Sequence, residues 1–233
     1  MATNQYQITI INKSNLDKQY LLFQTNPTQN EQPSSNVFLN VYQASAIVPG
    51  ADNNGGTSST TFKITKEWYA VNGTSPSPLN ANVTVTTTQS EPVTLGGASN
   101  QGTTLALTTV NSDGNDPEFD DSKTQSTAPN GSFVINTDST FSFPNENNIF
   151  IGLGAPDPVE SSLIVPVATI AALPSSSFTI WPHNKWFIGT GSFEPGTIID
   201  IANVGVTQPV DFETGLPKQS FTNNPNGTYT PSA

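Results

Sequence analysis

The sequence predicts an all-β protein built from two homologous antiparallel β-sandwich domains. Three observations lead to this fold class. Short runs of alternating apolar and polar residues recur along the 233-residue chain, with turn-forming residues between them. No window of ten or more residues shows the period of an amphipathic helix. A long stretch of the first half also reappears in the second half, which indicates an internal duplication.

Each half contains short runs that are typical of strands. In the first half we expect strands at 6–10, 20–23, 37–42, 61–64 and 83–86. In the second half we expect them at 132–135, 148–153, 163–167, 178–181, 185–188 and 197–201. Pro166 and Pro182 lie inside or beside such runs, and proline cannot donate a ladder hydrogen bond. Both positions therefore predict edge strands.

The internal repeat is clearest between residues 62–74 and 178–192, once a two-residue insertion is allowed. The matching pairs are Phe62 and Phe178, Ile64 and Ile180, Trp68 and Trp186, Tyr69 and Phe187, and Gly73 and Gly191. A repeat of this length is too large for a solenoid unit. It predicts a duplicated domain, and two similar domains create a cleft in which a ligand can bind.

The chain is long enough for two domains of ordinary size. We place the first β-sandwich at 1–110 and the second at 132–233. Residues 111–131 between them are the most polar and acidic part of the sequence, and they are expected to form a linker. Phe119 is the one large apolar residue in this segment, and it could hold the segment against a domain.

The composition excludes several classes of function. The formal net charge is −11, whereas nucleic acids and anionic membranes need a basic protein surface. No apolar run is long enough to span a membrane. The chain contains no cysteine, which removes disulfides and thiolate chemistry. The first residues lack the basic and apolar regions of a secretory signal, so we expect a cytoplasmic protein. The oligomeric state is left open.

The acidic segment is a candidate site for a hard divalent cation. Asp116, Glu118, Asp120 and Asp121 lie close together in sequence, and Gly114 allows a sharp turn before them. Several carboxylates without sulfur ligands suit Mg²⁺ or Ca²⁺. The spacing is not that of an EF-hand loop. The alternative is a solvated, charged linker that binds no metal.

Aromatic residues around the single histidine form the second candidate site. Trp181, His183, Lys185 and Trp186 lie within six positions, and their counterpart in the first half contains Trp68 and Tyr69. These side chains could line a pocket for a flat apolar ligand, with a polar end held by His183 or Lys185. Alternatively, Trp68 and Trp186 are core anchors of a sandwich, because both copies of the repeat retain them. Residues without a partner in the first half are better candidates for a single ligand site.

Catalysis finds little support in the sequence. A nucleophile and base pair would need His183 or a carboxylate or lysine in its place, and no catalytic or nucleotide-binding motif occurs. We therefore expect a binding protein and not an enzyme.

The duplicated pattern, together with the mass of 24.7 kDa, the acidity and the absence of cysteine, resembles the fungal chromoproteins that hold a pigment non-covalently, the pink-coloured type of oyster mushrooms. The resemblance lies mainly in the paired segments at 68–74 and 186–191. It implies two sandwich domains with a conjugated organic chromophore between them and a metal ion nearby.

These observations together predict a chromoprotein. The expected chromophore is a small conjugated molecule with a carbonyl or enolate end, whose charge a divalent cation or Lys185 would hold. A carbohydrate-binding, lectin-like module is the main alternative, because aromatic side chains stack on sugar rings and amides bind hydroxyl groups. A cytolytic β-protein is the third alternative, and the acidic surface disfavours it.

Overall fold

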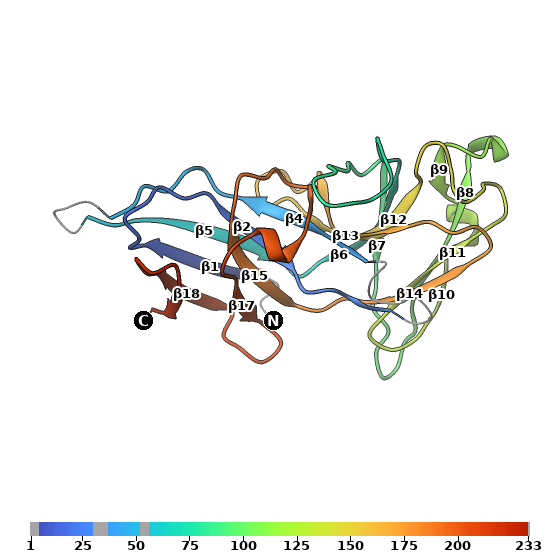
Figure 1. Ribbon diagram of the computed structural model, residues 1–233. Coiled ribbons are helices and arrows are strands. Elements are labelled where there is room, and N and C mark those ends of the chain that lie inside the picture. The colour runs from blue at the N-terminus through green and yellow to red at the C-terminus, as the bar shows by residue number, and fades with distance from the viewer. Residues whose placement is uncertain (1–4, 30–36, 52–55, 233) are drawn as a thin grey trace.

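The computed structural model describes residues 5–29, 37–51 and 56–232 and has an elongated, almost entirely β architecture (Figure 1). Helical structure is limited to short 3₁₀ turns in the described residues: η2 (Val110–Ser112), η3 (Asp121–Lys123) and η4 (Ile201–Asn203). The all-β prediction is therefore confirmed.

One long sheet runs through the whole molecule. Its strand order is β17-β15-β2-β4-β13-β12-β6-β7, and β16 pairs with β4 off this path. The strands are β2 (Tyr20–Gln24), β4 (Phe38–Ala44), β6 (Trp68–Gly73), β7 (Gln89–Val93), β12 (Phe150–Pro156), β13 (Ile164–Ala171), β15 (Lys185–Thr190), β16 (Ile198–Ile199) and β17 (Gln208–Asp211).

Two smaller sheets lie toward opposite ends of the molecule (Figure 1). The first has the order β19-β18-β1-β5, formed by β1 (Gln5–Asn12), β5 (Ser58–Thr65), β18 (Lys218–Asn223) and β19 (Tyr229–Pro231). The second has the order β10-β8-β11-β14-β3, with β9 paired to β8, and its strands are β3 (Thr28–Gln29), β8 (Gly102–Thr109), β9 (Pro117–Phe119), β10 (Gln125–Ala128), β11 (Phe133–Thr137) and β14 (Ser177–Trp181).

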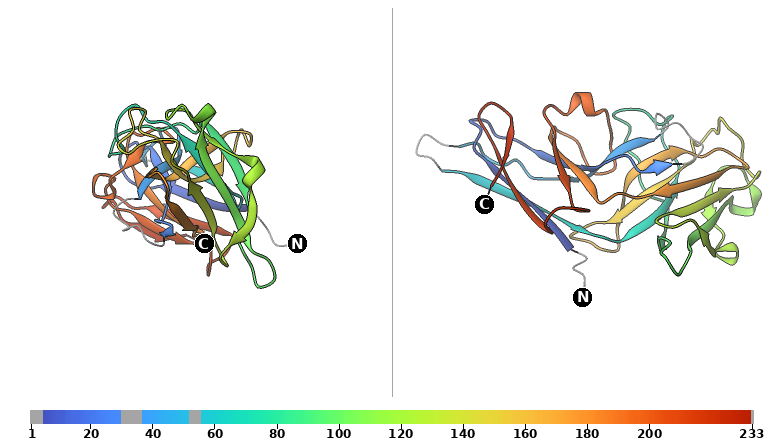
Figure 2. Two further views of the ribbon diagram at one scale, coloured as in Figure 1. Left: turned by 90° about the vertical axis from the view of Figure 1, so that its right-hand side faces the viewer. Right: turned by 90° about the horizontal axis from the view of Figure 1, so that it is seen from below.

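The strand pairing defines two lobes that do not follow the predicted domain boundaries. Strands β1, β2, β4, β5 and β15 to β19 form a terminal lobe, and strand β3 together with β6 to β14 forms a central lobe (Figure 2). Residues 1–110 and 132–233 therefore share the long sheet, and each contributes strands to both smaller sheets. We describe the chain as two interleaved lobes and not as two sandwiches joined in series.

The strand order has a two-fold pattern. Reading the long sheet from either end gives corresponding strands: β17 corresponds to β7, β15 to β6, β2 to β12 and β4 to β13. Likewise β18-β1-β5 corresponds to β8-β11-β14, with one parallel pair in each set. Even the β-bulges correspond, because β2 shifts register between Leu22 and Phe23 and β12 between Leu153 and Gly154. Such a pattern is consistent with the predicted duplication.

Two connections between the lobes lie at corresponding places in the strand pattern. The first crossover, Thr65–Trp68, joins β5 to β6, and the second crossover, Trp181–Lys185, joins β14 to β15. Both lie in the repeated segments that the sequence singled out. Each repeat thus contributes strands to both lobes, and this exchange explains why a boundary drawn between the repeats does not separate the sheets.

The segment 111–131 is part of the sheet structure and not an open linker. Strands β9 and β10 within it both pair with β8. Phe119 is 4% exposed and belongs to the main core cluster, which contains residues from both lobes. The predicted anchoring role of Phe119 is confirmed, because its ring holds the segment against the central lobe.

Two details of the strand prediction are wrong. Pro166 lies in β13, an interior strand, where it adjoins the bulge opposite Gly154. A bulge removes the need for a ladder donor, so proline is tolerated there without an edge. The run at 83–86 forms a single bridge between Thr84 and Thr197 and not a strand.

Candidate functional site

The paired tryptophans lie in the core. Trp186 is fully buried, with its ring 5.1 Å from that of Tyr42, and its Nε1 donates a hydrogen bond to Asn184 Oδ1 at 3.0 Å. Trp68 is 6% exposed and belongs to the same core cluster. Corresponding β-strands place both rings in equivalent positions between the sheets. These contacts match the core role that the repeat suggested for both residues.

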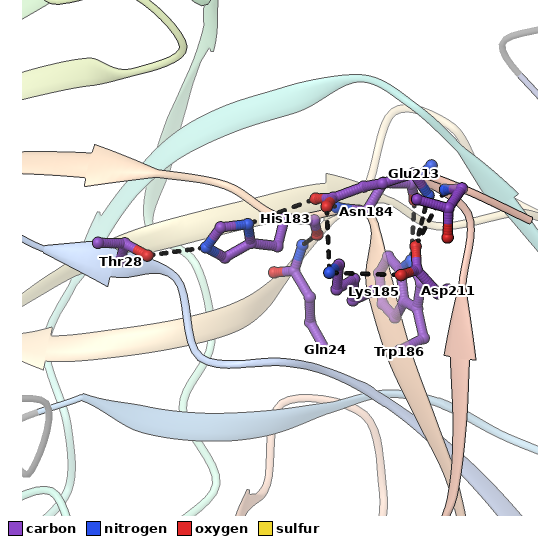
Figure 3. A network of polar contacts seen from close by, with 9 residues as sticks. Gln24, Thr28, His183, Asn184, Lys185, Trp186, Asp211 and Glu213 are labelled. Carbon is purple, nitrogen blue, oxygen red and sulfur yellow. Dashed lines mark hydrogen bonds and ion pairs between the residues drawn. The ribbon is translucent and has the colours of Figure 1, made fainter.

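A polar network surrounds His183 at the second crossover (Figure 3). Its Nε2 is 2.8 Å from Thr28 Oγ1, and its Nδ1 is 3.4 Å from Glu213 Oε1. The backbone carbonyl of His183 accepts a hydrogen bond from Gln24 Nε2. The network connects β3 of the central lobe to β2 and the segment after β17 in the terminal lobe.

Lys185 completes this network through two carboxylates. Its Nζ lies 3.3 Å from Asp211 Oδ2 and 3.3 Å from Glu213 Oε2. Hydrogen bonding to Asp211, followed by that to Glu213, raises the pKa of Lys185 above its usual value. Desolvation acts to raise the pKa of Asp211, but the backbone N–H groups of Glu213 and Thr214 together with Lys185 lower it below its usual value. The positive charge of Lys185 is thus balanced by two carboxylates of the same chain.

Trp181 lies beside this network because β14 pairs with β3, and the register places Trp181 opposite Thr28. Its Nε1 donates to the Asn130 carbonyl at 3.1 Å, and the side chain is half-buried. The structure therefore brings Trp181, His183 and Lys185 to one region, and their role in binding a ligand stays a prediction. Trp186 points into the core beneath them.

The first crossover has a different character. Lys66, Glu67, Trp68 and Tyr69 line a shallow hollow of about 420 Å³ together with residues 92, 93 and 95. Tyr69 is half-buried there, whereas the bulk of Trp68 lies in the core. The predicted ligand residues therefore fall at two separate places, one at each crossover, and not in one pocket.

The four predicted metal ligands do not form a cation site. Among the described residues, no three histidine, cysteine or acidic side chains converge on one point. Asp120 pairs with Lys123 at 2.8 Å and accepts a hydrogen bond from Ser122 N, and these contacts lower its pKa. Asp116 N donates to Asp113 Oδ1, which also accepts from Asn115 N. The carboxylates of Asp113 and Asp120 therefore cap local turns, and β9 and η3 spread the four predicted ligands along the chain.

The sequence did not predict an apolar cavity that the structure contains. It has a volume of about 500 Å³ and lies where β4 begins, β13 ends and β12 is about to start. Its lining is Phe38, Pro78, Leu79, Phe143, Pro144, Asn145, Asn148, Ile149, Ile170, Ala171 and Leu173.

Loops complete the cavity wall. Asn145 Nδ2 donates to the Gly114 carbonyl at 2.7 Å, and Asn148 Nδ2 donates to the Ser75 carbonyl at 3.2 Å. Both amides therefore tie the lining loops together, and they are the only polar side chains among the described lining residues. Phe143 is 56% exposed beside the cavity. An exposed Phe-Pro pair at 143–144 is the one sequence signal that could have indicated this place.

The comparison with protein-family models decides the family. The model described as RhiA matches residues 3–232. The chain belongs to the RhiA family. No curated protein matches the chain, and no solved structure matches it. In this RhiA-family chain, the described residues include no helix that is long and apolar enough to cross a membrane.

Proposed function

We propose that this RhiA-family protein binds a small, mainly apolar organic molecule non-covalently, and that the molecule is a conjugated pigment. The apolar cavity of about 500 Å³ carries this proposal. Ligand pockets usually have volumes of about 300–1,000 Å³, a mainly apolar lining and few polar groups. The resemblance to pigment-holding fungal proteins supplies the class of ligand.

The cavity differs in two ways from the site expected from the sequence. It lies at the junction of β4, β13 and β12 and not at the aromatic segments. Among the described residues no charged side chain lines it, and Lys185 is not one of its lining residues. We include no divalent cation in the proposal, because among the described residues no three acidic or histidine side chains converge on one point.

The carbohydrate alternative has less support from the same geometry. Sugar binding needs several polar groups that are free to reach hydroxyls, whereas both lining amides donate to loop carbonyls. An apolar wall gains free energy by removing hydrocarbon from water, roughly 25 cal/mol per Å² of buried apolar surface. The cavity therefore suits a hydrocarbon-rich ligand.

The test begins with the visible spectrum of the natively purified protein, followed by organic extraction and mass spectrometry of the extract. We expect absorbance that moves with the protein and is lost on extraction. Leu79→Trp should fill the cavity and reduce ligand content several-fold. Leu216→Trp is the matched control, because Leu216 is 74% exposed and does not line the cavity. Equal ligand content in both variants, or a colourless protein without extractable compound, would reject the proposal.

A further inference from the structure

The polar network at the second crossover is a second candidate site. Thr28 Oγ1, the His183 ring and the Glu213 carboxylate follow one another in a line, with contacts of 2.8 Å and 3.4 Å (Figure 3). A hydroxyl, an imidazole and a carboxylate in this order form the arrangement that activates a hydroxyl nucleophile. We propose that Thr28 is a nucleophile with His183 as its general base, and that it reacts with small activated carboxylic esters.

The hydrogen bonds fix the roles of the two ring nitrogens. Glu213 carries no proton donor when ionised, so the contact at Oε1 requires a hydrogen on His183 Nδ1. In the neutral ring Nε2 is then an acceptor, and the 2.8 Å contact is a hydrogen bond donated by Thr28 Oγ1. This tautomer is the one that a general base needs.

Two further contacts fix the position of the Glu213 carboxylate. Its Oε1 also accepts from the Asn184 backbone N–H at 3.2 Å, and its Oε2 lies 3.3 Å from Lys185 Nζ. Lys185 in turn contacts Asp211, so the charged groups that face the imidazole are Glu213 directly and Lys185 and Asp211 behind it. Glu213 therefore acts as a positioning residue, because its carboxylate orients the imidazole ring.

The position of Thr28 leaves it open to a substrate. Thr28 is exposed, and the side chain of His183 is 32% exposed. Trp181, opposite Thr28 in the β3–β14 register, offers an apolar surface for an acyl group.

The reaction balances with the ester and water alone. Thr28 Oγ1 forms a bond to the ester carbonyl carbon while its proton moves to His183 Nε2. The bond from that carbon to the leaving oxygen then breaks, and His183 returns the proton to the leaving alkoxide or phenoxide. Water, deprotonated by His183, attacks the acyl-threonine, and the proton returns to Thr28 Oγ1 as the carboxylic acid leaves.

The experiment uses 4-nitrophenyl acetate with the full chain and follows 4-nitrophenolate release. We expect a burst of about one equivalent per chain, and an acetyl group that peptide mass spectrometry maps to Thr28. Thr28→Val and His183→Gln should each lower the rate about 100-fold, which is the lower end of general-base contributions of about 10²–10⁴. Thr28→Ser should retain the activity because it keeps the hydroxyl.

The pH profile separates general-base catalysis from simple bracing. The rate should rise with pH along one ionisation curve, and His183→Gln should abolish this dependence because it removes the general base. Thr61→Val is the matched control, since Thr61 is exposed and its hydroxyl forms a hydrogen bond with the Thr9 hydroxyl, away from the network. Circular dichroism checks that each variant is folded. Acetylation that maps to lysines or to His183, or equal rates in Thr28→Val and Thr61→Val, would overturn the inference without bearing on the apolar cavity.

Discussion

The two crossovers occupy corresponding places in the two-fold strand pattern but differ in what surrounds them. At the second crossover, Lys185 pairs with Asp211 and Glu213, and His183 connects to Thr28. At the first crossover, Lys66 and Glu67 are exposed and, within the described chain, neither forms an ion pair. An open hollow of about 420 Å³ lies there instead.

The strand registers show the cause of this difference. Trp186 pairs with Val210, and Trp68 pairs with Val93, so the positions after Val93 correspond to those after Val210. Asp211 and Glu213 then correspond to Thr94 and Gly96, which carry no charge. The comparison teaches that the residues shared by both repeats, above all the two tryptophans, build the core, whereas the unshared residues supply the polar chemistry.

The largest loss of stability should come from replacing the tryptophans that both repeats share. Trp186→Ala and Trp68→Ala should each lower the free energy of unfolding by about 3–5 kcal/mol, the usual range for large-to-small core changes. Trp186→Ala should cost more, because it also removes the partner of Asn184 Oδ1. Urea unfolding measures both. Trp186→Phe, which keeps most of the apolar volume, should recover part of the loss. A cost for Trp186→Ala no greater than for Leu216→Ala at the surface would contradict the core assignment.

The sequence predicted the local features of the fold but not the pairing of distant strands. Apolar runs of strand length predicted β1, β2, β4, β5 and β11 to β15, because such runs are a local signal. Burial alternates in β1 and β5, whereas β2, β12 and β13 are buried along almost their whole length. The repeat located both crossovers. The sequence does not show the exchange of strands between the repeats, because the residues of a strand do not specify which other strand it pairs with. The domain boundaries at 110 and 132 therefore did not coincide with the lobes.

The candidate site was predicted only where neighbours in sequence are also neighbours in space. Trp181, His183 and Lys185 came together because one short connection contains them. Their partners Thr28 and Glu213 lie 155 and 30 positions away from His183 and gave no local signal. The apolar cavity was missed for the same reason, because its walls come from the start of β4, the end of β13 and three loops.

The next largest loss of stability should come from replacing Glu213, an acidic residue of the network that the first repeat lacks. Glu213→Ala should lower the free energy of unfolding by about 1 kcal/mol, the upper end for exposed ion pairs, because three donors lose their acceptor. Glu67→Ala at the first crossover should change it by less than about 0.5 kcal/mol. Thermal unfolding of the two variants at low and high salt compares them. Equal losses would show that the network adds nothing that the open crossover lacks.

A smaller effect should appear on acidification. The pKa of Asp211 is lowered in the folded protein, so its contribution to stability is present above its unfolded pKa of about 3.9 and is lost as pH falls through the folded value. Asp211→Asn removes this contribution. The stability difference between wild type and variant should therefore shrink as pH falls below about 4. Urea midpoints measured at a series of pH values test this, and Asp17→Asn, whose carboxylate lies in the terminal lobe outside the network, is the control.

The smallest change in stability should come from introducing the missing ion pair at the first crossover. Glu67 and Thr94 correspond to Lys185 and Asp211, so Glu67→Lys combined with Thr94→Asp should recreate that ion pair. Replacing Thr94 also removes its hydrogen bond with Thr103, and a double-mutant cycle subtracts this cost. We expect a coupling energy of about 0.2–1 kcal/mol that falls as salt is added, because the pair would be exposed. A coupling of zero at low salt would mean that the two crossovers differ in backbone geometry and not only in side chains.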